Sequence, residues 1–110
     1  MKTEAGNKKI ESLLKSVRKE FKADDIVKKL HEIREIAREE KNPALVKICR
    51  LSYEFIEENG NFDIQFVDEE EGIEMSDMEY LLELMLHSDR EVNMSEIKEI
   101  RDVLNEALYG

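Results

Sequence analysis

The sequence predicts an all-α protein, a five-helix compact bundle with one extended acidic segment between the third and fourth helices. Three observations support this fold class. Apolar residues recur at spacings of three and four along most of the chain, which is typical of helices that bury one face. The 110 residues include only four Gly and one Pro, and such sparse turn chemistry disfavours a many-stranded β fold. Helix formers such as Glu, Lys and Leu are abundant.

The length favours a single domain over residues 1–110. Residues 1–6 lack an apolar pattern, so we expect them to fray. The first helix is predicted over 8–22, with a basic stripe beside its apolar one. The apolar stripe consists of Ile10, Leu13, Leu14, Val17 and Phe21.

The second helix is predicted to begin at Asp24 or Asp25, because a short carboxylate can accept hydrogen bonds from free first-turn amides. Its outer face mixes charges of both signs, which is typical of a solvated surface. Its predicted buried face consists of Ile26, Val27, Leu30, Ile33, Ile36 and Ala37.

Asn42 and Pro43 mark the start of the third helix, predicted over 44–59. Asn can cap a helix, and Pro fits its first position, where a missing amide costs nothing. Apolar residues occur on several sides of this helix, so we expect it to be the central one. Gly60 is the expected left-handed terminator.

The segment 60–76 lacks a helical pattern. Phe62, Ile64 and Phe66 alternate with polar residues, which indicates an extended segment anchored on the core by its aromatic and aliphatic side chains. A run of four acidic residues follows, at 68–71.

Ser76 and Glu79 form a capping box, in which each side chain can satisfy a free amide. The fourth helix is predicted over 77–87 and is dense in apolar residues, so it is either deeply buried or partly an interface. A polar connection is predicted over 88–94, with Asn93 or Ser95 capping the fifth helix. The predicted buried face of that helix consists of Ile97, Ile100, Val103, Leu104, Ala107 and Leu108.

The net charge of −10 is unevenly distributed. Residues 1–50 carry 14 Lys/Arg and 9 Asp/Glu, a balance of +5, whereas residues 51–110 carry 3 and 18, a balance of −15. Two interpretations stay open, a soluble surface on which acids cluster and a surface that docks on a basic partner.

Catalytic chemistry has little support. His31 and His87 belong to no recognisable motif, and Cys49 on the face of the third helix is predicted to be a small buried hydrophobe. We therefore expect no enzyme and no cofactor. Calcium-loop spacing fails from both Asp63 and Asp89, and no glycine-rich phosphate loop is present, so no metal site is predicted.

Composition also bounds the partners and the compartment. No window approaches 18 apolar residues and no secretory signal is visible, so no membrane association is expected. A single cysteine favours a reducing, cytoplasmic location. The basic stripe on the first helix is the only candidate for nucleic acid, and the acidic half opposes phosphate approach, so no direct nucleic-acid binding is expected.

The layout resembles phage antirestriction proteins of the Ocr type, small acidic helical proteins that mimic DNA. The residues that carry the resemblance are Gly60, 62–68 and 72–75, followed by the helix at Asp77. The resemblance implies an inhibitor whose carboxylates stand in for phosphates. The partner-binding residues that it implies are Asp68, Glu69, Glu70, Glu71, Glu74, Asp77 and Glu79. The basic residues of the first 50 positions depart from that pattern.

A second, local resemblance lies within 78–108. Residues 81–92, running into Ser95-Glu96-Ile97, are similar to a helix–loop–helix of the TerB-like tellurite-resistance family. Loops of that family usually carry Asp-Gly where this chain has Asp89-Arg90.

These observations favour a small acidic interaction protein without catalysis. We expect an inhibitor or adaptor that binds a basic or nucleic-acid-binding protein through its acidic C-terminal half. The first alternative is a self-associating structural protein, a homo-oligomer whose basic and acidic halves meet between subunits. An unrecognised enzyme is the second alternative.

Overall fold

The computed structural model describes residues 1–67 and 75–110, and it confirms the predicted all-α bundle. No strand occurs within these residues. The helices are α1 (Glu4–Lys19), α2 (Ala23–Glu39), α3 (Pro43–Asn59), α4 (Asp77–Leu86) and α5 (Glu91–Tyr109).

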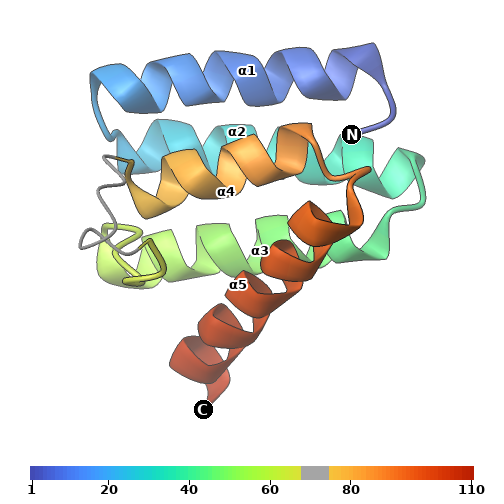
Figure 1. Cartoon of the computed structure of the whole chain (residues 1–110). Coiled ribbons are helices and arrows are strands. Elements are labelled where there is room, and N and C mark those ends of the chain that lie inside the picture. Colours follow the sequence, from blue (N-terminus) through green and yellow to red (C-terminus); the bar gives the residue numbers. More distant parts are fainter. Residues whose placement is uncertain (68–74) are drawn as a thin grey trace.

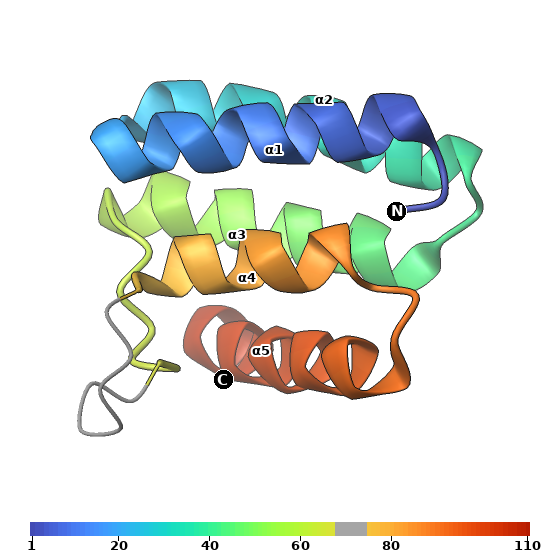
Figure 2. The same ribbon diagram turned by 45° about the horizontal axis from the view of Figure 1, so that its top comes forward.

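The five helices stack in three layers (Figures 1 and 2). The first layer contains α1 and α2, the second contains α3 and α4, and α5 crosses beneath the second layer at an oblique angle. In this stack α2 packs on α3, α1 packs on α4, and α5 contacts both α3 and α4. A single hydrophobic core therefore fills the space between the layers.

The third helix is the central one, as its apolar pattern predicted. Its buried residues include Leu45, Leu51 and Phe55, and it lies between α2 on one side and α5 on the other. A helix that is covered on two sides buries more than one stripe, which explains why its sequence is the least one-sided in the chain.

Two of the predicted helix starts are confirmed at atomic detail. Asn42 Oδ1 accepts the Leu45 amide at 3.2 Å at the start of α3. At the start of α4, Ser76 Oγ accepts the Glu79 amide at 3.2 Å. Gly60 ends α3 with a φ of 75°, in the left-handed region that a glycine adopts without steric cost.

The first helix begins earlier than predicted, and residues 1–6 have defined contacts where fraying was expected. Thr3 Oγ1 accepts the Gly6 amide at 3.1 Å and so caps α1. The Glu40 carboxylate accepts the backbone amides of Lys2 and Thr3 at 3.0 and 3.1 Å, which fastens this end to the end of α2. Thr3 is a good cap, but no apolar pattern follows it immediately, so the sequence signal was weak.

The predicted starts of α2 and α5 were wrong. The N-cap of α2 is Lys22 and that of α5 is Arg90, and neither side chain makes a capping hydrogen bond. Asp24 and Asp25 lie in the first turn of α2, where a negative charge still suits the helix dipole. Asn93 lies inside α5 and donates to the His87 carbonyl at 2.9 Å, so it holds the turn before the helix.

Some apolar residues predicted to be buried lie at the surface. Phe21 follows the end of α1 and is 37% exposed. On α5, Ile97, Ile100 and Leu104 are buried, but Val103 is 39% exposed and Ala107 is exposed. The buried stripe of α5 is therefore narrower than predicted, which leaves apolar side chains on its outer face.

Candidate functional site

The structure places two of the seven predicted partner-binding residues. Asp77 and Glu79 lie in the first turn of α4. The others, Asp68, Glu69, Glu70, Glu71 and Glu74, lie outside the described residues.

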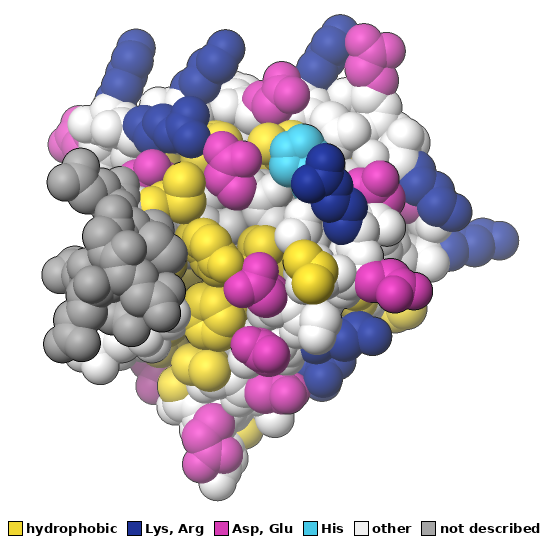
Figure 3. Space-filling model, in the orientation of Figure 1, with side chains coloured by type: hydrophobic (Ala, Val, Ile, Leu, Met, Phe, Trp, Pro, Cys, Tyr) yellow, Lys and Arg dark blue, Asp and Glu magenta, His cyan; other side chains and the backbone are white. Residues whose placement is uncertain are grey.

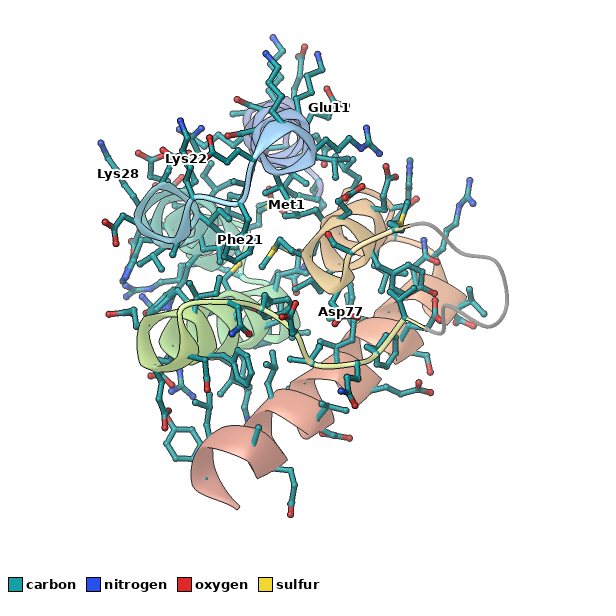
Figure 4. The ribbon with its side chains drawn as sticks, turned by 90° about the vertical axis from the view of Figure 1, so that its left-hand side faces the viewer. Met1, Glu11, Phe21, Lys22, Lys28 and Asp77 are labelled. Atoms are coloured by element: carbon teal, nitrogen blue, oxygen red, sulfur yellow. The ribbon has the colours of Figure 1, made fainter. Side chains whose placement is uncertain are left out.

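Asp77 holds the chain that leads out of α3. Figure 4 shows its side chain beside that chain at the start of α4. One carboxylate oxygen accepts the amides of Ile64 and Gln65 at 2.9 and 3.0 Å, and the other accepts those of Phe66 and Val67 at 3.0 and 2.8 Å. Hydrogen bonds to an ionised acceptor are stronger than neutral ones, so Asp77 fastens this segment to α4.

The segment fastened by Asp77 keeps the predicted alternation of burial but is not straight. Phe62 is 3% exposed, and Ile64 and Phe66 are partly buried, whereas Asp63 and Gln65 are exposed. Gln65 has a left-handed φ of 56°, which turns the chain so that its successive amides reach one carboxylate. Aromatic contacts complete the anchor, with 5.9 Å between the ring centroids of Phe62 and Phe55 and between those of Phe66 and Tyr80.

Glu79 is also engaged within the chain. Its carboxylate lies 3.5 Å from Arg18 Nε, and Arg18 Nη2 reaches Glu83 at 2.9 Å, so one arginine of α1 joins two acids of α4. The capping box is partly confirmed, because Ser76 Oγ accepts the Glu79 amide at 3.2 Å, and the Ser76 hydroxyl in turn donates to Glu79 Oε1 at 3.3 Å. Since these groups are partly exposed, we expect the ion pairs to orient α4 more than to stabilise it.

The outer face of α5 carries two of the exposed acids that stay unpaired among the described residues. Glu99 and Glu106 are exposed, and neither makes an ion pair or side-chain hydrogen bond with the described part of the chain. Val92, Glu99, Val103 and Glu106 follow one another at spacings of seven, four and three, which places them on one stripe of an α-helix. We call these four residues the α5 stripe.

The α5 stripe is apolar as well as acidic. Four large hydrophobic side chains are exposed among the described residues, and three belong to α5: Val92 at 72%, Val103 at 39% and Tyr109 at 63%. Figure 3 shows hydrophobic side chains between Asp and Glu side chains along this helix. An apolar group within a charged surface is the composition expected at a docking site.

The opposite end of the molecule is basic and is largely neutralised by local pairs. Figure 3 shows Lys and Arg side chains gathered over the first layer. Within that layer Lys9 pairs with Glu32 at 3.2 Å, and Lys29 pairs with Asp25 at 3.3 Å. Over residues 1–40 the first layer carries 11 Lys/Arg and 9 Asp/Glu, a balance of +2, whereas α5 carries 2 and 5, a balance of −3.

The two histidines and the cysteine have ordinary structural surroundings. His31 stacks on Tyr53 with 3.8 Å between ring centroids, and His87 follows the last turn of α4. Cys49 is fully buried, and burial raises the pKa of its thiol to about 12. A thiol with that pKa is almost wholly protonated at neutral pH, so it is a poor nucleophile.

The buried thiol gives a simple prediction. In the folded protein at mildly alkaline pH, we expect Cys49 to react with a disulfide reagent at least about a hundredfold more slowly than in denaturant, because thiolate and access are both lacking. The absorbance of the thiolate that the reagent releases measures both rates. Equal rates would show that Cys49 is accessible in the native state.

The described residues contain no group of three or more His, Cys, Asp and Glu side chains placed to hold a metal ion. None of the helices in that part of the chain has the length and apolar character needed to cross a bilayer.

The sequence contained the signal for the α5 stripe, since the spacing of seven, four and three is readable from it. Val103 was assigned to the buried face together with its neighbour Leu104. The orientation of α5 on α3 and α4 decides which of these two neighbours is covered.

Comparisons with known proteins complete this description: no family model matches the chain, and neither the curated proteins nor the solved structures contain a significant match.

Proposed function

We propose that this protein acts by binding a partner protein that carries a basic surface, and that the α5 stripe is the centre of the contact. The observation that supports the proposal is the pairing of free carboxylates at Glu99 and Glu106 with exposed valines at 92 and 103. The valines supply apolar area that is lost to water on binding, and the carboxylates supply charge complementarity.

The charge of the C-terminal half gives the partner its chemical class. With a balance of −15 over residues 51–110, long-range attraction would accelerate encounter with a positively charged surface. Surfaces that hold nucleic acid are of this kind, so an inhibitor or adaptor acting on a nucleic-acid-binding protein is the most specific form of the proposal. In that form, duplex DNA and this protein compete for the same partner surface.

Affinity capture from the native host tests the proposal. We expect the wild-type protein to retain a partner that elutes at moderate salt, since screening weakens attraction between exposed charges. The double substitution Glu99→Lys and Glu106→Lys should abolish retention. The matched control is Glu11→Lys with Glu39→Lys, which makes the same change in net charge at exposed positions of α1 and α2. This control should retain the partner.

A third variant separates the α5 stripe from the acidic run of the sequence. If reversing Glu69, Glu70 and Glu71 releases the partner while the α5 variant keeps it, the docking surface is the run and the proposal is wrong. If all three variants release the partner equally, only net charge matters and no defined surface exists.

A further inference from the structure

A basic groove lies where α2 ends and α3 begins. It has a volume of about 540 Å³ and is open to solvent. Its charged lining consists of Arg38, Lys41, Lys47 and Arg50, and Pro43 and Val46 provide apolar surface. Among the described residues no acidic side chain lines it, although the chain as a whole carries a net charge of −10.

Two of the four cations have no partner of opposite charge. Arg38 pairs with Glu35 at 3.3 Å, and Arg50 pairs with Glu54 at 3.1 Å. Lys41 and Lys47 are exposed and make no ion pair with the residues that the structure describes. The groove therefore combines free positive charge with apolar surface.

Lys41 occupies a conformation that side chains rarely adopt. Its φ is 56°, in the left-handed region, at the position after the α2 cap where glycine or asparagine is usual. A lysine there costs stability relative to glycine, and it adds a cation to the groove. This choice of residue is consistent with use of the groove in binding.

We infer that the groove receives the α5 stripe of a second copy of this chain. The two surfaces are complementary, since one combines two unpaired lysines with apolar side chains and on the other two unpaired glutamates alternate with valines. The inference rests on the proposed function, because it names one basic partner for the same stripe. A small ligand requires a more enclosed cavity, and a nucleic acid would be repelled by the acidic half.

Net charge opposes self-association, so the distance over which salt screens the repulsion decides the salt concentration of the experiment. Two copies of net charge −10 repel each other, but at about 0.15 M salt charges are screened beyond roughly 8 Å. That distance is short compared with the 35 × 30 × 29 Å extents of the molecule. Contacts between groove and stripe then act with little opposition from the remaining charge.

Sedimentation equilibrium at about 0.15 M salt and high protein concentration tests the inference. The wild-type protein should show an average mass above the 13.0 kDa of one chain, rising with concentration. Lys41→Glu with Lys47→Glu, and separately Glu99→Lys with Glu106→Lys, should each weaken association at least about tenfold. The control Glu11→Lys with Glu39→Lys should associate as the wild type does.

The decisive experiment mixes the groove variant Lys41→Glu with Lys47→Glu and the stripe variant Glu99→Lys with Glu106→Lys. The mixture contains one intact groove with one intact stripe, and one reversed groove with one reversed stripe, so association should return. Both variants stay negatively charged, with four charges moved in opposite directions, so net charge does not explain recovery.

Two results would overturn the inference: a single 13.0 kDa species at every wild-type concentration, or a mixture that stays monomeric. Binding of duplex DNA to the groove without self-association, detected by fluorescence anisotropy, would also overturn it. In each of these cases the proposed function stands if the captured host partner is still released by the α5 variant alone.

Discussion

Replacing Asp77 by alanine is expected to lower the free energy of unfolding by roughly 2–4 kcal/mol. The substitution removes the acceptor of four consecutive backbone amides, those of residues 64–67. Each hydrogen bond to a charged group contributes about 1.5–3 kcal/mol, but water can replace part of the loss because this segment is only partly buried. Urea denaturation measures the change in stability.

Asp63→Asn is the matched control for this prediction. Asp63 belongs to the same segment, is exposed and uses its side chain in no hydrogen bond with the described residues, so we expect a change within about 0.5 kcal/mol. Amide hydrogen exchange adds a local readout, with faster exchange at residues 64–67 in the Asp77 variant. Equal stability of the two variants would show that the four amides do not depend on Asp77.

Phe62→Ala should have an effect of similar size, about 3 kcal/mol or more, because truncating a buried aromatic residue removes apolar burial and leaves a cavity. Phe62 is 3% exposed and packs edge-to-face on Phe55 of α3. It is the residue through which the non-helical segment enters the core. The midpoint of urea unfolding measures the loss.

Phe21→Ala provides the comparison with the same chemical change at the surface. Phe21 is 37% exposed, so we expect it to cost less than half as much as Phe62→Ala. If both variants lost the same stability, the segment after α3 would not be an anchored part of the core.

The fold class was predictable because helical periodicity and turn chemistry agreed. Asn42, Pro43, Gly60 and Ser76 each have one dominant structural use, and all four are used in that way. The starts of α2 and α5 were not predictable from capping rules, since Lys22 and Arg90 cap without a side-chain hydrogen bond. There the chain begins its helices where tertiary packing requires them.

The candidate site was less predictable than the fold, because a carboxylate can either bind groups of its own chain or face a partner. The sequence does not distinguish these two uses. Asp77 and Glu79 were grouped with the acids of the connecting segment because the layout resembles that of DNA-mimic proteins. In the structure Asp77 binds backbone amides and Glu79 contacts Arg18, a residue 61 positions away in the chain. Long-range partners of this kind become visible only once the helices are placed.

The α5 stripe illustrates the same limit for apolar residues. Periodicity shows that Val103 and Leu104 lie on adjacent parts of the helix surface, but it does not fix the edge of the buried face. Leu104 is fully buried, whereas Val103 is 39% exposed. A difference of one position along α5 thus separates a core residue from a residue of the proposed docking surface.

The valine methyl groups offer the most direct measurement of where a basic partner binds. The six valines are spread over the molecule: Val46 lies in the basic groove, Val67 ends the segment held by Asp77, and Val92 and Val103 belong to the α5 stripe. In a methyl NMR titration with an oligolysine peptide, we predict the largest shifts at Val92 and Val103. Shifts at Val67 with Val92 and Val103 unchanged would contradict the assignment of the docking surface to α5.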